Sequence, residues 1–393
     1  MTINLAGSIF SSLGYYGIFQ FGTTDPLTVN ILSTGSISGG AIVSAGSQLA
    51  LTNYGYLYGQ DAGITSSSFA DVLANRGEIF TTAGFAVALG GGADVLTNSG
   101  HITGDINLDS GDDRFYGGGG SVLGFLDLSS GNDVVDLRGA QIDGTDYGGD
   151  GNDTFIVDGT SFDLSEGVGL GVDLVKSTVS FELGDNFDNL TLLGAGDING
   201  TGNALANTIL GNGGDNRLNG DSGSDKPFGG AGDDRVFGDS GNDTLSSGSG
   251  NDLLSGGIGN DVMVGATGAD SLFGGAGRDV LTGDVGTTGS YEDVFVFQKI
   301  SDSANNALSD RISDFRIGED KIDLSVIDAR STTPANDAFT FVAGAFTNVA
   351  GQLRLQTSGA DTFVLGDVNG DGVADFRIVL TGNLALTASD FIL

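Results

Sequence analysis

The sequence predicts an all-β protein, a right-handed parallel β-helix or β-roll solenoid. Three observations predict this class: a nine-residue repeat over 211–282, a looser period of about 20 residues upstream, and apolar–polar alternation between the two. A helix repeats its faces every 3.6 residues and a strand every 2, so neither produces a period of nine. A larger coil that brings the same unit back at a fixed interval does.

Composition narrows the classes of partner. The 393 residues include 70 Gly and no Cys, and the formal net charge of −36 argues against nucleic acid and anionic membranes as partners. No apolar run reaches the length that spans a membrane. The start, "MTINLAGSIFSS", lacks the basic and then apolar segments of a signal peptide. If the chain is exported, we expect a route that needs no N-terminal signal.

Residues 1–150 are expected to form a wider parallel β-helix. Two markers recur there and just beyond it at spacings of 19 to 23 residues, first Asn53, Asn75 and Asn98, and then Asp94, Asp113, Asp133 and Asp153. The steps "LTNYGYL", "LANRGEI" and "LTNSGHI" resemble those of autotransporter and adhesin passenger regions, which implies a cell-surface or polysaccharide ligand. The Asp marker has two interpretations, an extension of an ion-binding ladder or plain turn residues. Asp153 is included among the predicted metal ligands.

Residues 151–201 are predicted to be a connecting β segment. The stretches "LVKSTVSFEL" and "NLTLL" alternate apolar and polar residues, as strands do. Just beyond, "GNALANTIL" already holds the nine-residue frame, with Asn207 in the sixth place. We therefore expect it to start the roll that follows.

Residues 202–283 contain eight unbroken nonapeptides, which start at residue 211. The fourth position is always Gly, and the eighth is apolar in seven units. The sixth is Asp in seven units, namely Asp225, Asp234, Asp243, Asp252, Asp261, Asp270 and Asp279, and Asn216 in the first. This pattern is similar to the calcium-binding nonapeptide G-G-x-G-x-D-x-U-x of RTX proteins.

The charge pattern explains why such a repeat needs an ion. The last three residues of each unit are expected to form a short strand, and two units to close one coil, so that Asp residues 18 apart stack at roughly the 4.8 Å strand spacing. Two carboxylates at that distance repel by on the order of 3 kcal/mol at an effective dielectric constant of about 20. The segment holds eleven Asp and only four basic residues, so a hard divalent cation is the expected counter-charge.

The predicted calcium ligands are the seven Asp residues and the glycines that open the units, Gly229, Gly238, Gly256, Gly265 and Gly274. The expected pairs are Asp225–Asp243, Asp243–Asp261, Asp261–Asp279, Asp234–Asp252 and Asp252–Asp270, with a weaker sixth site at Asn216. This gives five or six ions. Lys226 and Pro227 depart from the repeat, and Pro cannot donate to a strand ladder. The first sites are therefore expected to be poorly formed.

Residues 284–393 begin with a five-residue insertion, after which Asp293 and Phe295 keep the Asp-x-apolar step. The blocks "SDRISDFRIGEDKIDLS", "GDVNGDGVADFRIVL" and "LTASDFIL" resemble the C-terminal domain of serralysin metalloproteases. That resemblance implies a β-sandwich-like cap, secretion by a type I exporter, and an export signal that ends in an acidic and then apolar residues, here Asp390 to Leu393.

The loop "DVNGDGVAD" spaces Asp367, Asn369, Asp371 and Asp375 like the start of an EF-hand. It lacks the closing Glu, since Ile378 stands there, and a hairpin turn between the flanking strands is the alternative.

Enzymatic chemistry has little support in the residue types. His101 is the only His, so the zinc motif H-E-x-x-H of serralysins cannot be built within these residues. We therefore expect a secreted, extracellular calcium-binding RTX protein that folds on extracellular calcium and serves surface adhesion, a matrix or a surface layer. The alternative is a polysaccharide lyase or epimerase with its site in residues 1–150.

Overall fold

The computed structural model describes residues 1–10, 17–21, 25–39, 42–168, 171–284, 291–330 and 337–393. The described residues are almost entirely strands and turns, with one 3₁₀ turn, η1 (Ala388–Asp390), so the predicted all-β class is confirmed. None of their helices has the length and apolar character to cross a membrane. The chain divides into two compact units, residues Met1–Val179 with Gly184–Asn189, and Ser180–Leu183 with Leu190–Leu393. The finer boundaries after residues 150, 201 and 283 stay a prediction.

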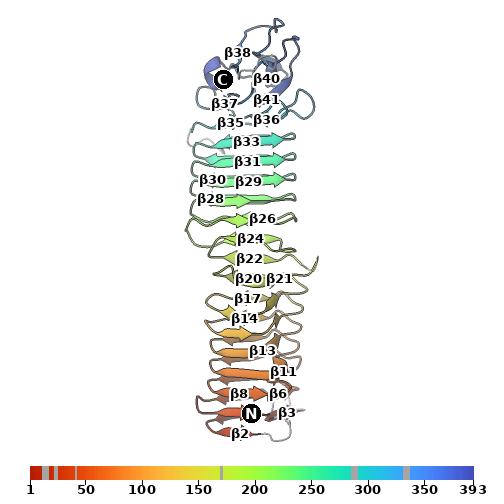
Figure 1. The fold of residues 1–393 in the computed structure, drawn as a ribbon, viewed down its shortest axis with the longest axis vertical. Helices are drawn as coiled ribbons and strands as arrows, with labels where there is room; N and C mark the ends of the chain where they lie inside the picture. Colours follow the sequence, from red (N-terminus) through yellow and green to blue (C-terminus); the bar gives the residue numbers. More distant parts are fainter. Residues whose placement is uncertain (11–16, 22–24, 40–41, 169–170, 285–290, 331–336) are drawn as a thin grey trace. The chain divides into compact units, whose positions relative to one another are not determined.

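The first unit is a parallel β-solenoid in which each coil adds one strand to one sheet and one or two strands to the other (Figure 1). One sheet consists of β1 (Thr2–Leu5), β4 (Leu27–Ile31), β7 (Leu49–Asn53), β10 (Val72–Asn75), β12 (Val95–Asn98), β14 (Arg114–Tyr116), β17 (Val134–Asp136), β20 (Thr154–Val157) and β22 (Leu174–Ser177). The other contains β2 (Ser8–Phe10), β3 (Ile18–Phe21), β5 (Ser36–Ser38), β6 (Ile42–Ala45), β8 (Tyr56–Gly59), β9 (Ile64–Thr65), β11 (Glu78–Ala88), β13 (His101–Asn107), β15 (Ser121–Leu123), β16 (Leu126–Asp127), β18 (Gln141–Ile142), β19 (Thr145–Tyr147) and β21 (Asp163–Ser165).

Strand alternation builds a wide core in this unit. In β4 the burial alternates residue by residue, and Leu27, Val29 and Ile31 are fully buried. Because side chains point to opposite faces at successive positions, one sheet face lines the interior while the other meets water. The coil from residue 49 to 70 buries four large apolar side chains, Leu49, Leu51, Leu57 and Ile64.

The second unit contains the nonapeptides as two stacked parallel sheets (Figure 1). One holds β26 (Thr208–Leu210), β28 (Lys226–Ala231), β30 (Thr244–Ser249), β32 (Val262–Thr267), β34 (Val280–Asp284) and β36 (Arg311–Ile312). The other holds β23 (Phe181–Glu182), β25 (Gly200–Thr201), β27 (Arg217–Asn219), β29 (Arg235–Ser240), β31 (Leu253–Ile258), β33 (Ser271–Ala276), β35 (Val294–Val296), β37 (Lys321–Asp323) and β42 (Phe391–Ile392). The strand β24 (Asn189–Leu192) begins at the boundary between the units.

The roll strands are longer than expected. The sequence predicts three-residue strands, whereas β29 to β33 each span six residues, because pairing continues into the first three positions of the next nonapeptide. The apolar residue at the eighth position does point inward, and all seven are fully buried: Leu218, Val236, Leu245, Leu254, Met263, Leu272 and Leu281. One large inward side chain per nine residues makes this core thinner than that of the first unit.

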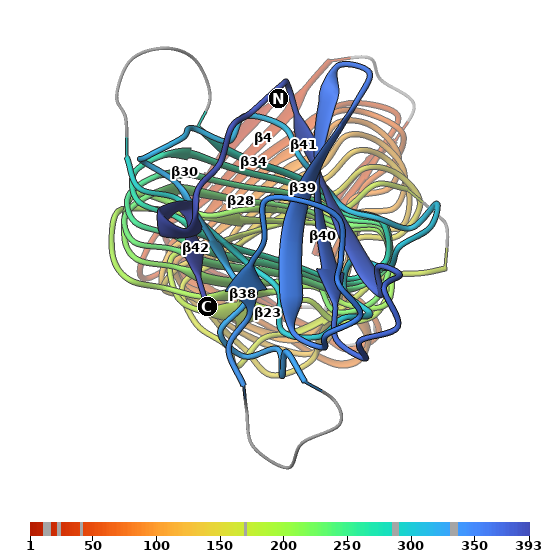
Figure 2. The same ribbon diagram turned by 90° about the horizontal axis from the view of Figure 1, so that it is seen from above.

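The last hundred residues add antiparallel strands to the roll. The strands β39 (Gln352–Ser358), β40 (Asp361–Asp367) and β41 (Phe376–Thr381) form an antiparallel meander (Figure 2), while β38 (Thr340–Phe341) pairs with β39 in parallel. The roll continues into this region because β36 pairs with β41 and β37 with β42. The core is continuous from Val236 to Phe391. The β-sandwich-like description of the cap stays a prediction.

Candidate metal centres

The Asp residues of the roll form two hydrogen-bonded columns. In each column the backbone N–H of one Asp donates to Oδ1 of the Asp one coil, or 18 residues, further on. These bonds are 2.7 Å for Asp225 to Asp243 and 2.8 Å for both Asp243 to Asp261 and Asp261 to Asp279. In the other column they are 2.7 Å for Asp234 to Asp252 and 2.9 Å for Asp252 to Asp270. All five predicted pairs therefore lie together.

The second carboxylate oxygen of each Asp has no partner among the described residues. These buried Oδ2 atoms belong to Asp225, Asp234, Asp243, Asp252, Asp261, Asp270 and Asp279. Burial, with neighbouring carboxylates adding to it, raises the pKa of Asp225, Asp234, Asp261 and Asp270 to about 7. Buried acceptors without donors are costly, and a column of them needs a positive counter-charge.

The opening glycines explain where such a counter-charge fits. A Cβ at Gly274 would lie 2.6 Å from Asp279 Oδ2, and a Cβ at Gly238 would lie 2.7 Å from the carbonyl oxygen of Gly256. The space beside Gly229, Gly238, Gly256, Gly265 and Gly274 is in each case faced by the Oδ2 atom of the Asp five residues later. Carboxylate and carbonyl oxygens are the ligands that calcium takes, so the donor set fits this ion.

The glycine at the fourth position has a different cause. At Gly250 the backbone φ is +137°, and a Cβ would lie 1.9 Å from the carbonyl oxygen of Gly232 in the preceding coil. A side chain is therefore excluded by both conformation and space. The second position also has positive φ but tolerates Asp221, Asp239 and Ala266. The Gly of the fourth position and the Gly that opens most units thus have separate reasons, coil stacking and the oxygen-lined space.

The columns continue beyond the nonapeptides. Asp270 N–H donates to Asp293 Oδ1 at 3.0 Å, and Asp279 N–H donates to Asp310 Oδ1 at 2.8 Å. The insertion before Asp293 falls on 285–290, outside the described residues. The sequence frame ended the column at Asp279, and that expectation is wrong, since Asp310 follows it in space. Asp310 lies 31 residues after Asp279, so the nine-residue spacing does not predict it. The only sequence signal is the step "SDRI", in which Asp is followed two places later by an apolar residue.

The departure from the repeat at Pro227 changes strand pairing near this residue but not the position of Asp225. Pro227 is buried in the inward position, and β28 pairs with β30 only from Phe228 onward. Asp225 nevertheless keeps its place, since its Oδ1 accepts the N–H of Asn207 at 2.7 Å. At the same end of the roll, Asn216 N–H donates to Asp234 Oδ1 at 2.7 Å. The Pro therefore interrupts pairing with β30, keeps its pairing with Ile209 of β26, and leaves the side-chain column continuous.

The first unit carries two different polar ladders. The Asp column predicted from Asp94, Asp113, Asp133 and Asp153 is present, with N–H to Oδ1 bonds of 2.7 Å between successive members. Asp71 and Asp173, which sequence reasoning missed, extend it. The second ladder is made of fully buried amides, where Asn53 Nδ2 donates to Asn75 Oδ1 and Asn75 Nδ2 to Asn98 Oδ1, both at 2.8 Å.

The EF-hand-like loop uses its own carboxylates to form a turn between β40 and β41. Asp367 accepts the N–H groups of Gly370 at 2.7 Å and Gly372 at 2.9 Å, while Asp375 accepts that of Val368 at 2.7 Å. These bonds account for the acidic residues without an ion, which favours the hairpin-turn alternative.

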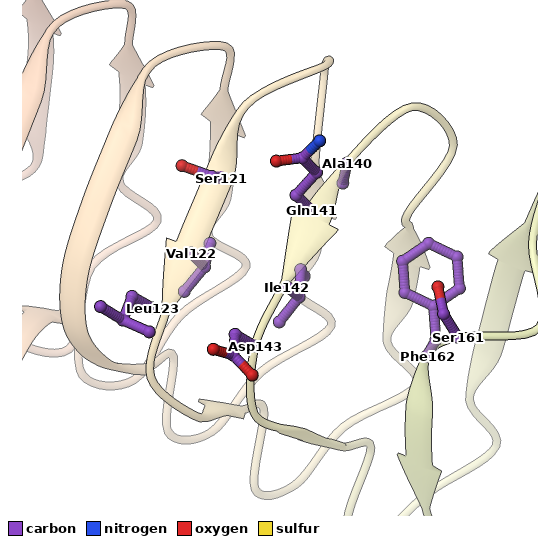
Figure 3. Close-up of a pocket in the computed structure, with 9 residues that line it drawn as sticks. All are labelled: Ser121, Val122, Leu123, Ala140, Gln141, Ile142, Asp143, Ser161 and Phe162. Carbon is purple, nitrogen blue, oxygen red and sulfur yellow. The ribbon is translucent and has the colours of Figure 1, made fainter.

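The outward face of the second sheet in the first unit offers concave surfaces. A groove of about 430 Å³ is lined by Ser121, Val122, Leu123, Ala140, Gln141, Ile142, Asp143, Ser161 and Phe162 (Figure 3). Another, of about 300 Å³, is lined by Tyr56, Glu78, Ile79, Phe80, His101 and Thr103. Strand register places Tyr56 beside Glu78 and Glu78 beside His101, and His101 Nδ1 lies 2.7 Å from Ser121 Oγ.

The fold and its Asp columns define a parallel β-solenoid of the RTX type. The chain belongs to the Peptidase M10 serralysin C-terminal family, whose model matches residues 41–393. This is the non-catalytic C-terminal part of serralysins, and the match extends well upstream of residues 284–393, which suggested it.

Individual relatives match parts of the chain. The chain is similar to the metalloprotease AprA of Pseudomonas entomophila, with 41% identity over 95 residues, which make up 24% of this chain and 19% of that protein. Among solved structures it is similar to the AlgE6R2 and AlgE6R3 subunits of the Azotobacter vinelandii mannuronan C5-epimerase. The first is 28% identical with a TM-score of 0.27, covering 41% of this chain and 88% of the other. The second is 24% identical with a TM-score of 0.18, covering 46% and 78%.

Proposed function

We propose that this is a secreted calcium-binding RTX protein that folds on extracellular calcium and serves surface adhesion, a matrix or a surface layer. The observation that carries the proposal is the buried, unpartnered Oδ2 atom that recurs in every roll coil. The net charge of −36 adds to it, because an acidic chain without counter-ions repels itself and stays open. Membership of the serralysin C-terminal family agrees with both points.

Different residues of the roll would bind the ions, form the core and set the register of the coils. Paired carboxylates such as Asp243 and Asp261, together with carbonyl oxygens of the opening glycines, would hold the ions between coils. Calcium supplies positive charge that cancels the repulsion along the column. The inward Leu and Val side chains close the thin core once the columns stack, and the N–H to Oδ1 bonds set the register. Ligands that bind only the folded state stabilise it by mass action. Five or six ions are proposed for the roll, and Asp293 and Asp310 offer two further pairs.

A calcium titration of the full chain followed by circular dichroism tests this proposal. We expect β signal from the roll to appear in a steep, cooperative step as millimolar calcium is added after chelation. Magnesium at the same concentration is the control, because its smaller octahedral shell fits a flexible oxygen cradle poorly. Full β signal in excess chelator would show that the fold does not need its ions.

Export is proposed to use a type I exporter that recognises Asp390 to Leu393. In the folded protein these residues are docked: Asp390 Oδ1 accepts the N–H of Gly318 at 2.9 Å, and Phe391 pairs with Ile322 in β37. The ending is therefore free for recognition only before the cap closes.

Deletion of 390–393 tests the export signal in cells that carry a compatible exporter. We expect the truncated chain to stay inside and still bind calcium once purified. Ile322→Ala is the matched control, because it weakens the same strand pair and leaves the ending intact. Equal export of the truncated and full chains would contradict the proposed position of the signal.

The first unit is proposed to bind the cell-surface or polysaccharide ligand. Its support is the outward face, where Tyr58 and Phe80 stack at 5.6 Å beside the groove that contains Tyr56, Glu78 and His101. Aromatic faces flanked by polar groups suit sugar rings. Retention of the calcium-loaded chain on immobilised polysaccharides, compared with Phe80→Ala, checks this role.

The same face supports the second candidate, a polysaccharide lyase or epimerase. His101 and Glu78 lie on paired strands in one groove, so an imidazole and a carboxylate, both common in acid–base catalysis, line the same surface. Unsaturated or epimerised products from uronic-acid polymers, lost in His101→Ala, would establish this activity. Ligand retention without any product would leave adhesion as the function.

A further inference from the structure

Three buried carboxylates meet in the first unit outside the nonapeptide roll. They are Asp153, just before β20, Glu166, just after β21, and Asp173, just before β22. One oxygen from each lies within 4.8 Å of the others. Asp153 and Asp173 are 1% exposed and Glu166 is 6% exposed, so all three have left water almost completely.

Two of the three side chains direct an unpartnered oxygen at one point. Asp153 Oδ2 and Glu166 Oε1 are buried without a hydrogen-bond partner. Both face the space beside Gly148, where a Cβ would lie 2.5 Å from Asp153 Oδ2 and still closer to Glu166 Oε1. Two other oxygens of the cluster are held, since Asp173 Oδ1 accepts the N–H of Asp153 at 2.8 Å and Glu166 Oε2 that of Gly149 at 3.2 Å. The backbone therefore orients the cluster and leaves its free oxygens converging.

The cluster differs from a roll site by one charge. In the roll, the space beside Gly238 is faced by Asp243 Oδ2 and by a carbonyl oxygen of the next coil, that of Gly256. Beside Gly148, the carboxylate of Glu166 takes the place of that carbonyl. No ion pair formed by the described residues includes any of the three acids. Since affinity for calcium rises with the number of charged ligands, this site should bind it more tightly than a roll site.

We propose that Asp153, Glu166 and Asp173 form a separate calcium site in the first unit, one that fills at lower free calcium than the roll. Glu166 is the residue that distinguishes it, because no position of the nonapeptide supplies a Glu. The site would join the turn after β21 to the starts of β20 and β22. This part of the first unit would then be ordered around its ion before the roll closes.

Counting bound calcium on the full chain, by native mass spectrometry at buffered free calcium, tests the proposal. We expect one ion to remain at a free calcium at which the roll is empty. Glu166→Gln should lose that ion, with affinity lower by about tenfold or more, because one of the three charges is gone. Glu182→Gln, at an exposed position, is the matched control and should bind as the unaltered chain does.

Two further measurements keep the test decisive. Hydrogen exchange of the unaltered chain should show the first ion protecting residues 145–168 before 211–282. Gly148→Ala keeps all three acids and fills the space, so it should also lose the ion. If a shared proton rather than calcium joins the acids, Glu166→Gln will bind the same number of ions at every calcium concentration. That result, or first protection in the roll, would overturn the site without touching the calcium-dependent folding of the roll.

Discussion

The amide ladder of the first unit and the carboxylate columns of the roll both stack one polar side chain per coil, but they differ in whether the stacked groups satisfy each other's hydrogen bonds. In Asn53, Asn75 and Asn98 each amide carries both a donor and an acceptor, so each residue satisfies the next. In Asp243, Asp252 and Asp261 each carboxylate only accepts, and one oxygen per residue is left without a partner. A ladder of amides satisfies its own hydrogen bonds, whereas a column of carboxylates needs a cation to balance its unpaired oxygens.

The hydrophobic core is also larger in the first unit than in the roll. One coil of the first unit buries Leu49, Leu51, Leu57 and Ile64, while an 18-residue roll coil buries only two large side chains, such as Leu245 and Leu254. The roll therefore has less apolar burial per coil to oppose backbone entropy, while both units contain Asp columns with buried, unpartnered oxygens. Calcium dependence is expected to be a regional property of the chain.

Calcium removal should produce the largest difference in stability between the two regions. In excess chelator we expect exchange protection over 211–282 to fall by orders of magnitude, while the Asn-ladder strands β7, β10 and β12 keep most of theirs. Hydrogen exchange with mass spectrometry measures both regions in one experiment. Equal loss in the two regions would show that the amide ladder does not decide the difference.

Replacing single members of the columns should distinguish inner from end positions. Asp252 and Asp279 each stack between two carboxylate neighbours, because Asp310 follows Asp279, whereas Asp225 stacks between Asn207 and Asp243. Changing either inner residue to Ala should raise the calcium midpoint by roughly threefold, and Asp225→Ala by less. The sequence frame alone expected Asp279 to be an end position with the smaller effect. A calcium titration by circular dichroism measures the three midpoints, and a smaller shift at Asp279 would restore that expectation.

Asn75→Asp would remove the side-chain hydrogen-bond donor at the middle of the amide ladder. The carboxylate cannot donate to Asn98 Oδ1, so two buried acceptors face each other and the first unit should lose about 3 kcal/mol of stability. Asn30→Asp is the control, because the Asn30–Asn4 amide pair is exposed and its loss should cost less than about 0.5 kcal/mol. Denaturant unfolding of both variants in chelator measures the difference. A near-neutral Asn75→Asp would contradict the role given to the amide donors.

Asp146 should show what burial does to a carboxylate that has no ladder. It is fully buried, neither oxygen has a partner, and burial raises its pKa to about 7. Since that pKa exceeds the unfolded value of about 3.9, the folded state binds more protons between these values and stability falls as pH rises from about 4 to 7. Asp146→Asn should make this slope shallower, because the other buried carboxylates with raised pKa still contribute, and it should raise the melting temperature at pH 8 more than at pH 5. Asp143→Asn, at an exposed neighbour, should change neither, and an unaltered slope in Asp146→Asn would place the titrating group elsewhere.

Sequence periodicity determined the stacked coils, the inward apolar position and the five Asp pairs of the roll. It could do so because a residue repeated at a constant interval returns to the same place in every coil, so spacing along the chain becomes position in space. The same reasoning found the Asn ladder and most of the Asp column in the first unit. The fourth-position Gly was also readable from its invariance over eight units.

Only the tertiary structure decided what lies where the interval breaks. Asp293 and Asp310 join the columns after spacings of 23 and 31 residues, and Glu166 reaches a site from a place that no repeat marks. The six-residue length of the roll strands and the docking of Asp390 against Gly318 likewise depend on contacts between distant segments. The physical reason is common to all of them. A periodic pattern encodes neighbours one coil apart, whereas irregular turns bring groups together through the path of the backbone, which no local spacing records.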